Sequence, residues 1–167
     1  MSVPDAYHGL WRRQGIWRSD GSSDSTTVVL WFQSAHWHID SRGFAGTTVV
    51  QGARCEWHPA IAYPPLGPGI DAGTMRFDGA DTVEETGIDG SYRELWVRID
   101  AGPVRAQRFA RDDGALAWLM SGAAWTAWAH GHPGGMAHFS IARGDAATLP
   151  PQAGSGWRAT TPAARRR

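Results

Sequence analysis

The sequence predicts an all-β protein built as a single closed, up-and-down barrel of about ten antiparallel strands. Turn signals rich in glycine recur at short intervals, and the segments between them are rich in β-branched and aromatic residues. No segment has a convincing helical pattern. Sequential hairpins dominate, and closing such a sheet into a barrel removes its exposed edges.

The first half of the chain contains most of the clear strand patterns. The expected strands are 9–18, 26–33, 37–40, 46–51, 54–58, 73–77, 82–86 and 91–100. Asp78-Gly79 and Asp89-Gly90 are dipeptides typical of hairpin turns. Residues 59–70 hold four prolines and two glycines, so a loop is expected there, because proline cannot donate to a β-ladder.

The second half continues the same pattern. The expected strands are 104–110, 116–120, 124–130 and 136–143, with 156–161 as a closing strand. Gly122 and the spacing of the tryptophans favour two strands over a helix in the alanine-rich residues 115–129. We therefore expect one barrel domain over residues 1–161 and a disordered, arginine-rich tail over 162–167.

Composition limits the classes of partner. The 167 residues suit one domain, and the 16 basic and 16 acidic residues balance, so neither nucleic acid nor a membrane is expected as a partner. Every basic residue is arginine, and lysine and asparagine are both absent, which suggests GC-rich, bacterial coding and rules out Schiff-base chemistry. Cys55 is alone, and neither a signal peptide nor a membrane span is apparent. We expect a cytoplasmic monomer or homodimer.

One predicted strand has the pattern of a pocket wall. Side chains alternate faces along a strand, so Tyr92, Glu94, Trp96 and Arg98 share one face. An aromatic, an acid, an aromatic and a base in sequence suit the inside of a barrel that holds a ligand. The chain also contains ten tryptophans, of which most are expected in the core and a few around a flat or apolar ligand.

The sequence also resembles known barrels. Gly9-Leu10-Trp11 resembles the Gly-x-Trp opening of the calycin group, the lipocalins and fatty-acid-binding proteins, which implies that Trp11 plugs the closed end. Ordered blocks from there to about residue 100 are similar to an uncharacterised bacterial and fungal family of calycin-like barrels that includes a two-barrel yeast protein of unassigned function. The blocks include Cys55-Glu56-Trp57-His58 and Glu84-Glu85-Thr86-Gly87. The chain departs from that family at Pro59 and in a short segment, 38–43, near a barrel mouth.

The leading functional hypothesis is binding of a small apolar or aromatic molecule inside the barrel, with no cofactor and no metal. The expected ligand-binding residues are Arg12, Trp31, Trp57, His58, Tyr92, Glu94, Trp96 and Arg98. Polar groups among them would meet the ligand's polar end, and the tryptophans would stack on its flat part. A structural role for Glu94 is the alternative, in a buried ion pair with Arg12 or Arg98.

Three other interpretations stay open. The first is a cofactor-independent isomerase, cyclase or lyase, in which His58 and Glu94 transfer protons and Asp71, Glu84 and Glu85 are further candidate acids. The second is a protein-interaction module, which a pocket smaller than ~300 Å³ would favour. The third is a heme-binding barrel resembling the nitrobindins, with His138 as the ligand to the iron.

Overall fold

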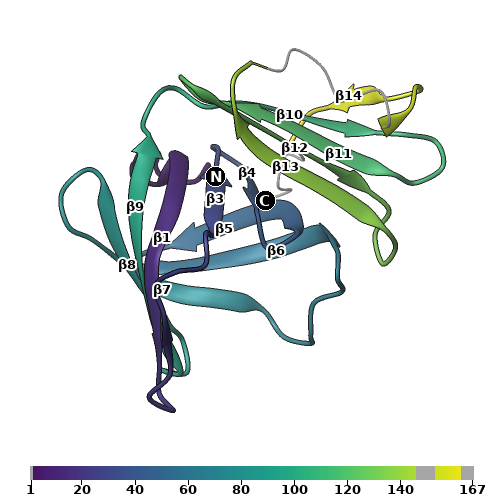
Figure 1. Ribbon diagram of the computed structural model, residues 1–167. Helices are drawn as coiled ribbons and strands as arrows, with labels where there is room; N and C mark the ends of the chain where they lie inside the picture. Colours follow the sequence, from purple (N-terminus) through teal and green to yellow (C-terminus); the bar gives the residue numbers. More distant parts are fainter. Residues whose placement is uncertain (1, 146–152, 163–167) are drawn as a thin grey trace.

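The first hundred residues form a closed barrel in the computed structural model, which describes residues 2–145 and 153–162 (Figure 1). Its eight antiparallel strands are β1 (Gly9–Arg18), β3 (Leu30–Gln33), β4 (Trp37–Asp40), β5 (Phe44–Gln51), β6 (Arg54–Ala62), β7 (Asp71–Phe77), β8 (Thr82–Gly87) and β9 (Tyr92–Asp100). The barrel closes where β9 pairs with β1, from Leu10 opposite Asp100 to Arg18 opposite Tyr92. The short strand β2 (Ser23–Asp24) adds to β1 near its end.

The remaining strands form a separate sheet of five. They are β10 (Arg105–Ala110), β11 (Leu116–Ser121), β12 (Trp125–Gly131), β13 (Ala137–Arg143) and β14 (Arg158–Thr160), in the order β13-β12-β11-β10-β14. The predicted all-β class and closed barrel are confirmed. The expected number of about ten barrel strands differs from the observed eight, because β9 already pairs with β1 along its whole length and leaves no edge for β10.

The five-stranded sheet lies across the outside of the barrel, next to β4 and β5 (Figure 1). Apolar side chains from both sheets bury one another there: Leu10, Phe32, Ile39 and Ile61 from the barrel, and Trp118, Met120, Ala127 and Ala129 from the five-stranded sheet. Trp11, Trp31 and His38 are next in sequence to Leu10, Phe32 and Ile39. Their side chains point the other way, into the barrel, and are also buried. Strands β1, β3 and β4 therefore separate two cores.

The closed end of the barrel is covered by the 3-10 helix η1 (Asp5–Tyr7). The indole N–H of Trp11, which is fully buried, donates to the carbonyl oxygen of Tyr7 at 2.8 Å. The guanidinium of Arg98 lies 5.1 Å from the Trp11 ring centroid and donates to the carbonyl of His8. Trp11 thus fills this closed end of the barrel.

Two predicted strands have an end that differs from the structure by more than two residues. Residues 26–29 are not part of a strand, because Thr26 and Thr27 donate their backbone N–H groups to the Asp24 carboxylate instead of a neighbouring strand. Strand β6 continues through Pro59 to Ala62, where a loop was expected. Pro59 lies opposite Gly46 beside a β-bulge, and bulges are among the few places in a sheet that accept proline.

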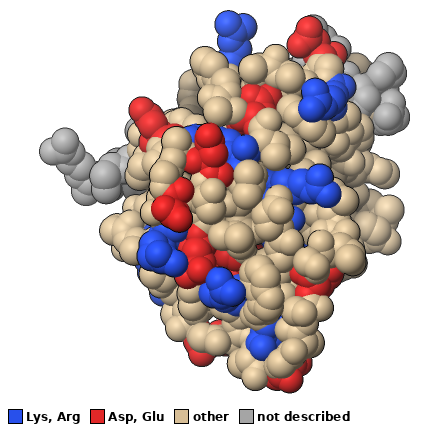
Figure 2. Space-filling model, turned by 60° about the vertical axis from the view of Figure 1, so that its left-hand side comes forward, with Lys and Arg blue, Asp and Glu red and all other residues tan. Residues whose placement is uncertain are grey.

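Acidic and basic side chains are interspersed over the face shown in Figure 2, in keeping with the balanced charge. Within the described residues, no helix has the length and apolar character needed to cross a bilayer. The predicted tail lies outside the described residues except for Pro162.

A candidate binding site at the open end of the barrel

The end of the barrel opposite Trp11 contains a cavity of about 120 Å³. Strands alternate in direction, so its walls come from the last residues of β1, β4 and β8 and from the first residues of β5, β7 and β9. The lining consists of Ile16, Trp31, Asp40, Arg42, Phe44, Trp57, Asp71, Glu85, Tyr92, Glu94 and Trp96. Polar and aromatic groups thus meet in one cavity at the mouth of the barrel.

Three tryptophans, Trp31, Trp57 and Trp96, form the inner wall of the cavity, and we call them the tryptophan cage. The Trp31 ring lies 5.5 Å from Trp57 and 5.6 Å from Trp96, with interplanar angles of 81° and 72°. Two rings therefore stand almost perpendicular to the third, a favourable edge-to-face geometry. The buried indole N–H of Trp31 donates to Gln33, which fixes the ring from behind.

Two of the carboxylates in the cavity wall are held by arginines. Arg42, in the turn between β4 and β5, donates from Nε and Nη2 to the two oxygens of Asp40, at 2.9 and 2.8 Å. Arg13 donates to Oε1 of Glu94 at 2.8 Å, and both of these side chains are buried. Arg13 also lies 3.7 Å from Asp24. The predicted buried ion pair of Glu94 thus exists, but its partner is Arg13.

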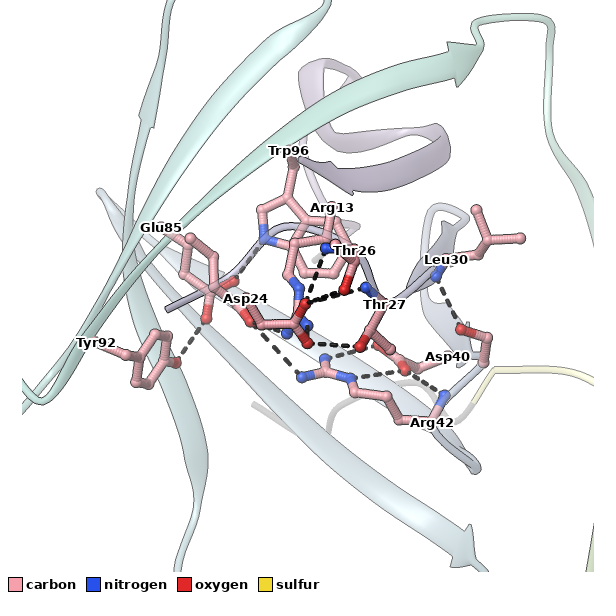
Figure 3. Close-up of polar contacts among 12 residues, drawn as sticks. Arg13, Asp24, Thr26, Thr27, Leu30, Asp40, Arg42, Glu85, Tyr92 and Trp96 are labelled. Atoms are coloured by element: carbon pink, nitrogen blue, oxygen red, sulfur yellow. Dashed lines mark hydrogen bonds and ion pairs between the residues drawn. The ribbon is translucent and has the colours of Figure 1, made fainter. Parts of the chain in front are cut away.

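Glu85 has a different environment. The hydroxyl of Tyr92 donates to Oε1 at 2.7 Å and the indole N–H of Trp96 donates to Oε2 at 3.1 Å, as Figure 3 shows. Within the described part of the chain Glu85 forms no ion pair, and it is 4% exposed. Burial, together with the nearby charge of Glu94 directly across the strand pair, raises the pKa of Glu85 from 4.5 to about 8.

Two glycines make room for this carboxyl group. A Cβ atom on Gly73 would lie 2.6 Å from Cγ of Glu85, and one on Gly87 would lie 2.6 Å from the Tyr92 ring. Gly73 and Gly87 are opposite each other on β7 and β8. The hydrogen-bonded pair of Glu85 and Tyr92 therefore requires glycine, which has no side chain, at both positions.

The cavity adjoins a groove on the surface. The groove has a volume of about 310 Å³ and shares Asp71 and Tyr92 with the cavity. Ile70 and Ile88 also line it and are 60% and 50% exposed. Asp71 stands at the junction and, among the described residues, forms no hydrogen bond or ion pair through its side chain. The open end thus offers a polar chamber that continues into a surface groove, where two exposed isoleucines lie among polar side chains such as Asp89 and Ser91.

The structure brings together five of the eight predicted ligand-binding residues. Trp31, Trp57, Tyr92, Glu94 and Trp96 all line the cavity. The shared face predicted for β9 is confirmed, although Arg98 lies on that face at the closed end, over Trp11, and not in the cavity.

Arg12 and His58 lie outside the barrel and require a correction. Trp11 and Trp57 point inward, so the residues that follow them point outward. Arg12 is exposed, and Arg13 is the arginine that enters the barrel. His58 bonds to Glu56 on the outer surface at 2.9 Å. The proton-transfer pair of His58 and Glu94 therefore does not form.

Sequence reasoning missed Asp40 and Arg42 as cavity residues. Their spacing of two residues around a tight turn was the available signal, because it lets the carboxylate accept from both the Arg42 backbone and its guanidinium. Asp71 and Glu85 were candidate acids and do line the cavity, whereas Glu84 faces outward and bonds to Arg76 and Arg93.

Histidine positions bear on the heme and metal hypotheses. His138, the candidate heme ligand, lies on β13 of the five-stranded sheet, where its ring stacks on His130 at 5.1 Å. It is therefore not part of the barrel. Within residues 2–145 and 153–162, no group of three or more histidine, cysteine or acidic side chains is arranged to hold a metal ion.

Comparison of the chain with models of protein families, with curated proteins and with solved structures finds no match. The functional argument therefore depends on the geometry of the cavity.

Proposed function

We propose that this protein binds a small organic molecule at the open end of a calycin-like barrel. The observation that carries the proposal is a cavity, open at its mouth, in which the tryptophan cage and ionisable groups face the same space. Barrel interiors without a ligand role are filled by apolar side chains, and convergent polar groups in an aromatic pocket are typical of binding sites. The plugged closed end with Trp11 supports the calycin-like assignment.

The size of the site needs the groove as well as the cavity. Alone, the cavity of about 120 Å³ is smaller than most small-molecule sites, which begin near ~300 Å³, and would favour the interaction module. The adjoining groove of about 310 Å³ brings the site into that range. We infer that one end of the ligand enters the tryptophan cage and that its remainder lies along Ile70 and Ile88.

Native mass spectrometry of the gently purified full-length chain tests this proposal, with tryptophan fluorescence titrations of a small-molecule set as a second readout. We expect a bound organic mass, or a ligand from the set, whose affinity falls at least tenfold in Trp57→Phe. Trp17→Phe is the matched control, because Trp17 is on the outer surface, stacked under Arg93. A clean apo mass with no fluorescence response, or equal binding by both variants, would contradict the proposal.

Proton transfer is a second candidate function. Glu85 and Glu94 are opposite each other on β8 and β9, yet Glu85 is held neutral by burial while Glu94 is paired with Arg13. Two neighbouring carboxyl groups in different environments are typical of acid–base catalysis. If the bound molecule is a substrate, it will take up carbon-bound deuterium from D₂O with the wild type and not with Glu85→Gln. If no deuterium exchange occurs, binding without catalysis is the function that the site supports.

A further inference from the structure

The charges around the cavity are unequal. Its wall contains four carboxyl groups, Asp40, Asp71, Glu85 and Glu94, and one guanidinium, Arg42. Arg13 adds a second positive charge from behind Glu94, but it also faces Asp24. A negatively charged ligand group would therefore meet an excess of carboxyl groups, whereas a cation would compensate them.

One carboxylate oxygen in the cavity wall also has no hydrogen bond from the described residues. Glu94 is 2% exposed, and no hydrogen bond reaches its Oε2 from the described residues, although Oε1 is bound by Arg13. Glu85 has hydrogen-bond donors but no counter-ion within the described residues. Glu94 is paired with Arg13 and lies 3.9 Å from Arg42, so Glu85 is the buried acid that lacks a counter-ion, and a buried charge is costly unless it is paired. The cavity thus has unused capacity for a positively charged group.

The aromatic rings offer the matching surface. The perpendicular walls of the tryptophan cage present ring faces and edges to one small space, and Phe44 and Tyr92 complete the lining. Tryptophan faces attract cations more strongly than other aromatic rings, and boxes of aromatic rings recognise substituted ammonium groups. The wall already uses this interaction, because the Arg42 guanidinium lies 5.9 Å from the Trp96 ring centroid.

We infer that the ligand is an amphiphilic organic cation, with an ammonium-type head in the tryptophan cage and an apolar tail along Ile70 and Ile88. This inference depends on the proposed binding function and adds the chemical class of the ligand. The cavity of about 120 Å³ suits a head group, and the exposed isoleucines of the groove suit a hydrocarbon chain.

Binding of such a cation is coupled to the proton on Glu85. The charged or titratable groups that face Glu85 are Asp71 on β7, Tyr92 and Glu94 on β9, Arg42 beside β4 and Cys55 on β6. Because the pKa of Glu85 is about 8, a cation that binds the ionised form must displace one proton at pH 7. Affinity therefore rises about tenfold between pH 7 and pH 9 for a cation of fixed charge.

The experiment compares three probes of similar length: hexyltrimethylammonium, hexanol and hexanoate. Their binding to the full-length protein is measured by calorimetry at pH 7.5. We expect the cation to bind at least tenfold more tightly than hexanol, and hexanoate to bind most weakly. Hexyltrimethylammonium is then titrated at pH 7, 8 and 9, where its own charge does not change.

Two variants of adjacent residues provide a matched pair. Glu85→Gln preserves the shape of the side chain and removes its charge, so we expect weaker cation binding at pH 9 and no dependence on pH. Glu84→Gln removes the neighbouring charge on the outer surface and should behave as the wild type. Circular dichroism of both variants confirms that they fold.

The outcomes separate the inference from the proposed function. If hexanol or hexanoate binds as tightly as the cation and Trp57→Phe weakens that binding, the site is real but the cationic class is wrong. If Glu85→Gln retains the wild-type pH profile, the inference is also wrong. If none of the three probes binds at any pH, both the cationic class and the proposed site lose their support.

Discussion

Glu85 connects the stability of the protein to its candidate site. Its carboxyl group accepts hydrogen bonds from Tyr92 and Trp96 and lies opposite Glu94. Burial disfavours the charged form of Glu85, and the nearby charge of Glu94 disfavours it further. Glu85 therefore keeps its proton at neutral pH. Ionisation of Glu85 is unfavourable in the protein without a ligand and becomes favourable when a positively charged ligand binds next to it.

The proton on Glu85 predicts how stability depends on pH. Its folded pKa of about 8 exceeds the ordinary value of 4.5, so the folded state holds a proton that the unfolded state releases. Stability should therefore fall as pH rises toward 8, by up to about 1.4 kcal/mol per pH unit. Urea unfolding at pH 6.5 and 8.5 should show this loss in the wild type and in Glu84→Gln, and not in Glu85→Gln.

The pH window is chosen to avoid an opposing group. Burial lowers the pKa of His38 from 6.5 to about 3, so its contribution to stability is lost as pH falls below 6.5. At pH 6.5 half of the unfolded His38 is still protonated, so between pH 6.5 and 8.5 this group opposes the loss by only about 0.4 kcal/mol. A wild-type protein that is equally stable at pH 6.5 and 8.5 would show that Glu85 is ionised in the folded state.

Strands β7 and β8 show how a local absence of side chains shapes the site. Gly73 and Gly87 are cross-strand neighbours, and the side chains of Glu85 and Tyr92 occupy the space above them. Glycine inside a strand weakens it and commonly marks a close approach of another group. Here the groups that approach are the carboxyl and the phenol of the candidate site.

Gly73→Ala tests this arrangement. The new methyl group would lie 2.6 Å from Cγ of Glu85, so the carboxyl group must move and its hydrogen bonds must weaken. We expect a loss of stability of about 1–3 kcal/mol, typical of overpacking. Gly67→Ala is the control, since no atom lies within 4 Å of its added Cβ. Thermal unfolding measures both, and equal melting temperatures would contradict the prediction.

The sequence predicted the positions of the strands better than it predicted which strands and side chains contact one another. Alternation along β9 placed Glu94 and Trp96 inside, since the register shift in β9 comes only after Arg98 and the period of two is kept before it. The same rule places Arg12 and His58 outside once Trp11 and Trp57 are expected inside, so the two adjacent residues could not both belong to the site. Which residue of such a pair faces inward must be chosen for each strand. That choice depends on contacts between distant strands, as does the closure of β9 on β1.

The whole molecule contains two cores with a common wall. The barrel interior packs around Trp11, Trp31 and Trp96, and a second core lies between the barrel and the five-stranded sheet. Trp118 is 1% exposed in that second core, whereas Trp128 faces away from the barrel and stacks on His130. The stability of the barrel should therefore depend on the sheet that covers it.

Substitution of these two tryptophans tests that dependence. Trp118→Ala should cost about 3–5 kcal/mol, as expected for a large side chain removed from a core. Trp128→Ala should cost much less, because its ring is partly exposed. Denaturant unfolding followed by barrel tryptophan fluorescence measures both variants. Equal costs would indicate that the sheet does not contribute to the second core.

The common wall also limits how the gene can be divided. The backbone leaves the barrel after Asp100, which resembles a natural place to separate two modules. A fragment ending there would expose the apolar side chains of Leu10, Phe32 and Ile39 to water, because the five-stranded sheet that buries them lies in the other half of the chain. A gene recombined at this junction would therefore encode a protein that aggregates. We expect the barrel and the five-stranded sheet to be inherited together.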